Sequence, residues 1–591
     1  MTYCAPLADI RFALKYGTAL PSVLEEGCFG DLTLADIDAI LLEASRMAAN
    51  VIAPINRVGD RYGTIFKDGV VTTAPGWKKA YSAWREAGWS ALTAPTEWGG
   101  QALPRVVNAA CTEMWNSASM AFGVGTLLTM GAIDALEIHG SDELKRAYLE
   151  KLVSSEWTGT MLLTEPHAGS DVGALSTRAE RVGDGTYRIA GQKIFITYGE
   201  HDLTNNIIHF VLARLPDAPP GTRGLSLFLV PKFLLNADGS PGVRNDVRAH
   251  SVEHKLGMHG SPTCTMIFGD RGGATGFIVG EENAGMACMF TMMNHARLDV
   301  GLQGVGIAEL ATQQALSYAR ERRQGRAAGK PATESLPIIT YPGIKRMLMT
   351  MLALTQAARA ICYVTATSLD RAERSTDKTE RQAAHARASL LTPVAKAFST
   401  DVGVEVALLG LEVHGGTGYI EETGAAQHFR DAWLGTIYEG TNGIQAIDLL
   451  TRKLPLAGGA VIESHINEMR SIVDAVNATN DAALGCSGAR LTEAVERLRR
   501  VTRWMLSQLD KNSNEALAGA AQYLRLFGVV TGGCLLARQA LAALRHNIEA
   551  EPRTLLSQFF AENIAVEAVM LERTVVDGAA SIIGADTVLA R

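Results

Sequence analysis

The sequence has no cysteine pair or histidine cluster with the spacing of a metal site. Its eight cysteines are scattered without a CxxC motif, so the residues indicate neither a bound metal nor a disulfide framework. The N-terminal stretch MTYCAPLADIRFALKYG has no basic segment followed by a continuous apolar core, and no Arg- and Ser-rich amphipathic pattern. We therefore expect a protein of the reducing cytoplasm.

An excess of basic charge is also missing. The formal net charge is -7 and the pI is near 6.1, whereas a nucleic-acid-binding domain normally has a basic face and a high pI. Several arginines lie between residues 485 and 545, but no comparable basic group occurs elsewhere. The charge balance therefore predicts no nucleic-acid partner.

Long hydrophobic runs are few. The longest charge-free run, residues 114–133, has the length of a membrane span, but it contains three glycines, two serines and an asparagine. This composition favours a buried helix pair over an integral membrane segment.

The composition is that of a large globular protein. The chain has 591 residues, of which 47% are hydrophobic and 20% charged, so it can bury several cores. We divide it into a helical domain (1–158), a β-domain (159–280), a helical bundle (281–455) and a further helical domain (456–591). The expected fold class is mainly α with a central β-domain.

Apolar spacing supports this division. Steps of three and four residues predict helices, and Thr33 or Asp31 is a candidate N-cap for the first of them. The positions that mark three helix faces are Leu34, Ile37, Ile40, Leu41 and Ala44; Ile307, Leu310, Ala311, Ala315 and Tyr318; and Leu491, Val495, Leu498, Val501 and Met505. The last face lies in the tail beyond 456, which carries no chemical motif, so we interpret it as a packing surface.

Short β-rich runs fill the middle of the chain. RIAGQKIFIT, NIIHFVLARL and RGLSLFLVP are rich in Ile, Val, Leu and Phe and are separated by Gly, Pro and Asp turns. Both alternating faces of RGLSLFLVP are apolar, which predicts a strand covered on two sides.

One acidic residue stands out in the segment IYEGT. Glu439 lies between Tyr438 and Gly440, and the pair Gly415 and Gly416 precedes it. A carboxylate beside glycine can approach a ligand closely, and burial would raise its pKa toward the range of a general base. The alternative interpretation is a solvated loop acid. No GxGxxG motif follows a predicted strand, so a nicotinamide site is not indicated.

Four further segments accompany IYEGTNGIQ in a fixed order: GTMLLTEPHAGSD, GQKIFIT, HKLGMHGSPT and YARERRQG. Together the five segments, spread over about residues 34–454, resemble the signatures of the acyl-CoA dehydrogenase family. The resemblance implies a helical domain, a small β-barrel or sheet domain and a four-helix bundle. The tail resembles the extra C-terminal helical region of a bacterial subgroup that acts on fatty acyl-CoA or 3-methylmercaptopropionyl-CoA.

The resemblance also implies a reaction. Glu439 matches the family's catalytic base, which removes the α-proton of an acyl-CoA while FAD takes the β-hydride, giving a trans-2-enoyl-CoA. Electrons would pass to an electron-transfer flavoprotein. In one subgroup of the family the catalytic base lies on another helix, at the position that is Ala296 in this chain, so that alternative base is absent here. An acyl-CoA oxidase that uses oxygen and a DNA-associated member of the superfamily are the alternatives.

Matching positions give the expected binding residues, with no metal ligand among them. Those expected at FAD are Met161, Leu163, Thr164, Gly169, Ser170, Phe195, Thr197, Arg322, Gly415, Gly416, Thr441 and Gly443. Those expected at the substrate are Ser170, Asn294, Arg297, Tyr438 and Gly440. By resemblance, Arg322, Gly415 and Gly416 serve the FAD of a neighbouring subunit, and the covering tail favours a homodimer.

Overall fold

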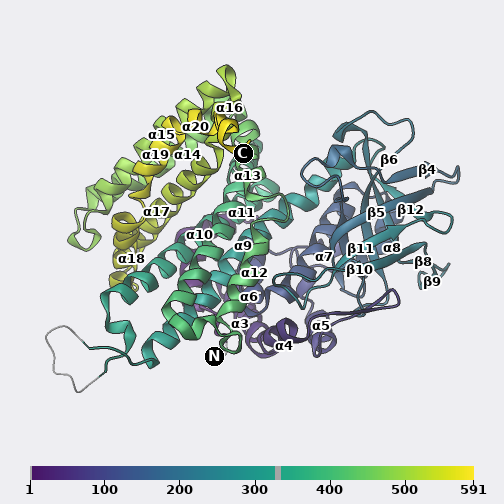
Figure 1. Ribbon diagram of the computed structural model, residues 1–591, viewed down its shortest axis with the longest axis horizontal. Coiled ribbons are helices and arrows are strands. Elements are labelled where there is room, and N and C mark those ends of the chain that lie inside the picture. Colours follow the sequence, from purple (N-terminus) through teal and green to yellow (C-terminus); the bar gives the residue numbers. More distant parts are fainter. Residues whose placement is uncertain (1–2, 327–334, 591) are drawn as a thin grey trace.

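A computed structural model describes residues 3–326 and 335–590 of the chain. A long helical bundle occupies the middle, with the β-domain on one side and the C-terminal helices on the other (Figure 1). The fold class expected from the sequence is confirmed.

The N-terminal region is a layer of helices. Its members are α1 (Leu7–Phe12), α2 (Leu20–Glu25), α3 (Leu34–Met47), α4 (Ala53–Tyr62), α5 (Trp77–Glu86), α6 (Arg105–Ala118), α7 (Met120–His139) and α8 (Asp142–Val153). Thr33 is the N-cap of α3: its hydroxyl accepts from the Asp36 amide, while the Asp36 carboxylate accepts from the Thr33 amide. This reciprocal capping selects Thr33 over Asp31.

A small β-hairpin interrupts this helical region and was not predicted. Strands β1 (Ile65–Lys67) and β2 (Val70–Thr72) pair antiparallel. The two residues between them, Asp68 and Gly69, both have positive φ angles, and an Asp-Gly pair in that conformation closes a two-residue hairpin. The signal was present in the sequence, but the strands are only three residues long.

The charge-free run 114–133 is a helix pair, as predicted. Extended backbone at Ser119 separates α6 from α7. Within the described residues, four helical stretches are long and apolar enough to cross a membrane, namely Met120–His139, Pro342–Arg374, Ala520–His546 and Ala550–Asp577. The apolar windows of the first three are 78%, 78% and 83% buried, so these are core helices of the fold. The fourth window is 44% buried.

The β-domain is a closed barrel. Its strands are β3 (Thr158–Leu162), β4 (Arg178–Arg181), β5 (Tyr187–Thr197), β6 (Ile207–Arg214), β7 (Leu225–Pro231), β10 (Val247–Val252), β11 (Thr263–Phe268) and β12 (Ala274–Val279). The sheet order is β10-β11-β5-β12-β7-β6-β3, and β4 bonds both β5 and β6, which closes the ring. A separate hairpin joins β8 (Phe233–Leu235) and β9 (Pro241–Arg244). Every residue of β7 is buried, which confirms the two-sided strand.

The bundle consists of α9 (Gly285–Glu321), α10 (Pro342–Arg374), α11 (Lys378–His414) and α12 (Ala425–Gly435), followed by the short α13 (Asn442–Asp448). Close approach joins it to the C-terminal helices: a Cβ added at Gly528 would lie 2.3 Å from the Phe398 ring. Glycine therefore lets α17 (Ala520–His546) pack directly on α11.

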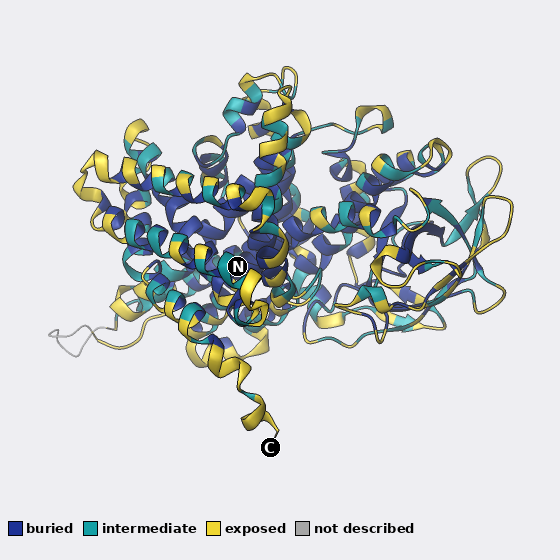
Figure 2. Cartoon of the chain, turned by 90° about the horizontal axis from the view of Figure 1, so that it is seen from above, coloured by how far each residue is buried: buried dark blue, intermediate teal, exposed yellow. Residues whose placement is uncertain are grey.

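The C-terminal region also contains α14 (Ala460–Thr479), α15 (Ser487–Lys511), α16 (Ser513–Ala518), α18 (Ala550–Asn563), α19 (Glu567–Asp577), α20 (Ala579–Ile583) and α21 (Asp586–Leu589). The predicted stripe from Leu491 to Met505 on α15 is fully buried. Figure 2 shows the buried residues continuing from the bundle into these helices, while the last helices are largely exposed.

Candidate active site

The loop that carries Glu439 joins α12 to α13 and has an unusual backbone. Glu439 has φ 56° and Gly440 has φ 82°, so two consecutive residues adopt left-handed conformations. A Cβ added at Gly440 would lie 2.9 Å from Nε2 of Gln445, and only glycine fits there. A non-glycine residue held at positive φ stores backbone strain, which is concentrated at functional sites.

Side chains from the neighbouring helices hold this loop in place. Nζ of Lys396, on α11, donates to the Gly440 carbonyl (2.9 Å) and to Oδ1 of Asn442 (2.8 Å). Nε2 of Gln445 donates to the Glu439 carbonyl (3.0 Å), and the hydroxyl of Thr441 caps α13 by accepting from the Ile444 amide. The carbonyl groups of the loop are therefore bound, whereas no acceptor within the described residues takes the Glu439 N–H.

Burial controls the charge of Glu439. It raises the pKa of the carboxyl group, and the positive charges of Arg297 and Lys396 partly oppose that rise. Burial likewise lowers the pKa of Lys396 to about 7, although Glu439 and Asp401 act to raise it. A buried carboxyl group with a raised pKa is a stronger base than a solvated one, and the two cations favour its ionised form.

The predicted substrate residues lie around the same loop. Tyr438 donates a hydrogen bond to Gln303 of α9. Arg297, also on α9, is 5% exposed and pairs with Asp448 of α13 at 3.4 Å. Arg297 and Asn294 both line a cavity of about 440 Å³ that is bordered by α6, α7, α9, α10, α11 and α13. Arg297 is close enough for its charge to act on Glu439, whereas Glu439 itself is not among the residues that line this cavity.

The β-domain brings together the residues expected at the flavin ring. The Ile194 amide donates to the Thr164 carbonyl at 2.9 Å, which places the segment from Met161 to Thr164 beside Phe195 and Thr197 at the end of β5. Phe195 has φ 60° and is 60% exposed. An aromatic ring that is held outward by a left-handed backbone offers a flat, exposed surface.

A buried ion pair, absent from the sequence-based interpretation, anchors this surface. Nζ of Lys193 donates to the Leu163 carbonyl (3.0 Å) and to Oε1 of Glu165 (2.9 Å). The Glu165 carboxylate also accepts from the amides and hydroxyls of Ser176 and Thr177. It thereby fixes both ends of the loop that contains Gly169 and Ser170, which are exposed.

Two contacts attach the β-domain to the helices of the base loop. The hydroxyl of Tyr198, the residue after β5, donates to the Ala121 carbonyl of α7 (2.9 Å). The Met258 amide donates to the carboxylate of Asp431 on α12 (2.6 Å), the helix that leads to Glu439. The orientation of the β-domain is thus linked to that of the base loop.

Arg322, Gly415 and Gly416 form a separate group. Tyr318 stacks on His414 with ring centroids 4.4 Å apart, and its hydroxyl bonds Thr417, which brings the ends of α9 and α11 together. With a rise of about 1.5 Å per residue, the part of α9 from Arg297 to Glu321, the residue before Arg322, is about 36 Å long. This group is therefore remote from the base of its own chain.

The comparisons with known proteins cover nearly the whole chain. Family models match residues 35–156 (acyl-CoA dehydrogenase, N-terminal domain), 160–271 (middle domain), 283–454 (C-terminal domain) and 465–586 (acetyl-CoA dehydrogenase C-terminal like). The 3-methylmercaptopropionyl-CoA dehydrogenase of Ruegeria pomeroyi is 46% identical over 92% of each chain. The chain belongs to the acyl-CoA dehydrogenase family.

Other relatives agree with this family. The broad-specificity linear acyl-CoA dehydrogenase FadE5 of Mycobacterium tuberculosis is 32% identical over 95% of each chain. A Bacillus anthracis acyl-CoA dehydrogenase solved in complex with FAD has the same fold, with a TM-score of 0.75, 20% identity, and coverage of 93% of this chain and 89% of that one. The protein is an FAD-dependent acyl-CoA dehydrogenase that acts on acyl-CoA thioesters.

The described residues fit FAD. The exposed Phe195 suits a flat ring, and a Cβ added at Gly169, Gly415 or Gly416 would meet nothing within 4 Å. At Gly443, beside the N-cap Thr441, such a Cβ would meet only the Thr441 hydroxyl at 3.7 Å. These open backbone positions leave room for a cofactor to approach the chain closely.

Proposed function

We propose that Glu439 is the base that removes the α-proton of the acyl-CoA substrate. The observation that carries the proposal is the geometry of its loop: the carbonyls are bound by Lys396 and Gln445, while the Glu439 carboxylate and N–H have no partner among the described residues. A base in a dehydrogenase needs both groups unengaged, because one takes the proton and the other can bind the thioester oxygen.

Two groups of Glu439, its N–H and its carboxylate, take part in the proposed reaction. The Glu439 N–H donates to the thioester carbonyl, which acidifies the α-carbon, and the carboxylate takes the α-proton. FAD, when bound, supplies the acceptor for the β-hydride, so that a trans-2-enoyl-CoA forms. Arg297 and Lys396 lower the pKa of the buried carboxyl group and so favour its ionised form before the reaction. Substrate in the pocket displaces water and strengthens these interactions.

The substrate that we propose is 3-methylmercaptopropionyl-CoA. The support is the 46% identity, over 92% of both chains, to a dehydrogenase named for that thioester. A linear fatty acyl-CoA is the second candidate, because FadE5 matches over 95% of both chains. The experiment is anaerobic bleaching of the flavin absorbance with a panel of acyl-CoAs. Bleaching fastest with 3-methylmercaptopropionyl-CoA supports the first candidate, and preference for a linear chain overturns it.

We further propose an electron-transfer flavoprotein as the acceptor and a cytoplasmic homodimer as the active form. The dimer is supported by the distance of Arg322, Gly415 and Gly416 from the base of their own chain, since a second chain's FAD would bring them into use. Admission of air to the enzyme after anaerobic reduction by substrate tests the proposed electron acceptor. Rapid release of hydrogen peroxide would instead identify an oxidase that uses oxygen. A sedimentation measurement of the holoenzyme tests the dimer.

A further inference from the structure

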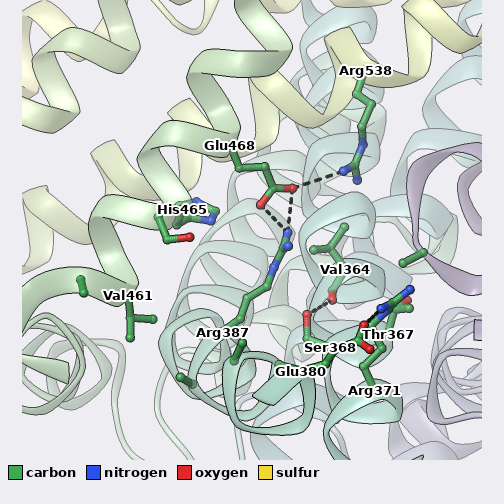
Figure 3. Close-up of a pocket in the computed structure, with 16 residues that line it drawn as sticks. Val364, Thr367, Ser368, Arg371, Glu380, Arg387, Val461, His465, Glu468 and Arg538 are labelled. Carbon is green, nitrogen blue, oxygen red and sulfur yellow. Dashed lines mark hydrogen bonds and ion pairs between the residues drawn. The ribbon is translucent and has the colours of Figure 1, made fainter. Parts of the chain in front are cut away.

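A cavity of about 530 Å³ lies outside the active site, between the bundle and the C-terminal helices. It is bordered by α10 and α11 of the bundle and by α14 and α17 of the C-terminal region, and Ala19 from the N-terminal segment also lines it. Three distant parts of the sequence therefore build one chamber (Figure 3). The mechanism above makes no use of it.

Positive charge is in excess at one end of the cavity. Within the described residues, Glu468 of α14 is the only carboxylate that pairs with Arg387 or Arg538: Nη2 of Arg387 lies 2.8 Å from it and Nη1 of Arg538 lies 3.5 Å from it. Figure 3 shows Arg387 reaching across from α11 to Glu468. At the other end Arg371 pairs with Glu380 and Glu26, so the unbalanced cation is confined to the Arg387–Arg538 end.

Unused hydrogen-bond donors occur at the same end. Within the described residues, Nε of Arg387, Nε of Arg538 and Nδ1 of His465 have no partner. His465 is 4% exposed, and its Nε2 contacts the Thr531 hydroxyl at 3.0 Å. Burial lowers its pKa to about 4, so the ring is neutral. If Thr531 donates to Nε2, Nδ1 carries the remaining proton and has no acceptor within the described residues.

Most of the remaining wall is small and apolar. Short aliphatic side chains come from the N-terminal segment, α10, α11 and α14, and three hydroxyl residues, Thr367, Ser368 and Ser464, lie among them. The aliphatic residues are Ala19, Val364, Ala383, Ala384, Ala386, Ala460 and Val461. A bare inorganic anion would leave this surface in contact with water. A molecule with one negative group and an aliphatic body matches both the cationic end and the apolar wall.

We infer that this cavity is a second ligand site, which binds a small aliphatic carboxylate with its charged group between Arg387 and Arg538. Binding there neutralises the excess guanidinium charge and fills the space between the bundle and the C-terminal helices. The site is separate from the acyl-CoA site because none of its lining residues belongs to the base loop or to the β-domain.

The test uses the FAD-loaded protein and sodium octanoate as the probe, with isothermal titration calorimetry. We expect saturable binding of one octanoate per chain and no binding of octanamide, which has the same chain without the charge. Arg387→Gln should weaken octanoate binding at least tenfold. The matched control Arg503→Gln removes an arginine that is 69% exposed on its side chain and should leave the affinity unchanged.

A second variant that keeps Arg387 makes the test independent of whether Arg387→Gln folds correctly. Ala383 is exposed at the mouth of the cavity, so Ala383→Trp should block the chamber without removing a charge, and it should abolish octanoate binding. Binding that survives both Arg387→Gln and Ala383→Trp would place octanoate elsewhere, including the acyl-CoA site, and would overturn the inference. Equal binding of inorganic phosphate, dependent on Arg387, would overturn the assignment to an aliphatic carboxylate.

Discussion

Two buried lysines hold the two parts of the active site, and they do so with different electrostatics. Lys193 supports the flavin-side segment through the Leu163 carbonyl, and Lys396 supports the base loop through the Gly440 carbonyl. Lys193 is paired with Glu165 at 2.9 Å, and its pKa is lowered by burial to about 8. Lys396 has no carboxylate within ion-pair distance among the described residues, and its pKa is lowered to about 7.

The difference separates a structural role from an electrostatic one. The charge of Lys193 is largely compensated by its own carboxylate partner, so it mainly fixes the shape of the flavin-side segment. The charge of Lys396 is uncompensated at short range and therefore acts on Glu439. The same residue type, placed in the same way under a backbone carbonyl, is expected to control cofactor retention in one region and proton transfer in the other.

The largest expected effect is at the base itself. Glu439→Gln keeps the size of the side chain but removes its ability to take a proton, so flavin reduction should slow by several orders of magnitude. Stopped-flow absorbance under anaerobic conditions measures this rate. FAD content and acyl-CoA binding should be retained, and turnover close to that of the wild type would remove Glu439 from the mechanism.

The next largest effect is expected at the paired lysine. Lys193→Met leaves Glu165 buried without its cation and should lower the free energy of unfolding by about 3–5 kcal/mol, with loss of FAD during dialysis. Urea unfolding of the holoenzyme and the flavin-to-protein absorbance ratio provide the two readouts. The double variant Lys193→Met/Glu165→Gln should recover part of the stability, and failure to do so would show that the pair is not the source of the loss.

A smaller effect is expected at the unpaired lysine, and it depends on pH. Glu439 must be ionised to act, so kcat/KM rises as the pH rises through its pKa, which lies above the ordinary value of 4.5. Lys396→Met removes a charge that lowers this pKa, so the acidic side of the pH profile of kcat/KM should move to higher pH. Because Lys396 itself titrates near pH 7, the difference from the wild type should shrink above that pH.

The conservative variant Lys396→Arg provides the control for this prediction. It keeps the charge and donors for the Gly440 carbonyl, and so the acidic side of its pH profile should stay near that of the wild type. If Lys396→Met instead lowers kcat/KM by the same factor at every pH, without shifting the pH profile, Lys396 has only a structural role.

The smallest effect is expected at the remote group. Arg322→Ala should weaken FAD retention several-fold without changing the rate of the reduction step in the fully loaded enzyme. Arg320→Ala, which removes another exposed arginine from the last turn of α9, is the matched control. Equal FAD content of the two variants after dialysis would contradict the role of Arg322.

Sequence periodicity and local motifs predicted the structural features that depend on residues close together in the sequence. The Thr33 cap, the two-sided strand β7 and the helix pair of residues 114–133 are of this kind. The support by Lys396 and Lys193 was missed, because each contacts a backbone group that is distant in the sequence, 44 residues away for Gly440 and 30 for Leu163. Closure of the barrel by β4 likewise depends on pairing between separated segments.

Proton transfer to Glu439 can be tested apart from the redox step. A 3-thia-acyl-CoA has sulfur at position three and no hydride to lose there, so only its α-proton can react. NMR in D₂O measures exchange of that proton on the FAD-loaded enzyme. The proposed mechanism predicts rapid exchange in the wild type and exchange slower by several orders of magnitude in Glu439→Gln; equal exchange rates in the two proteins would contradict it.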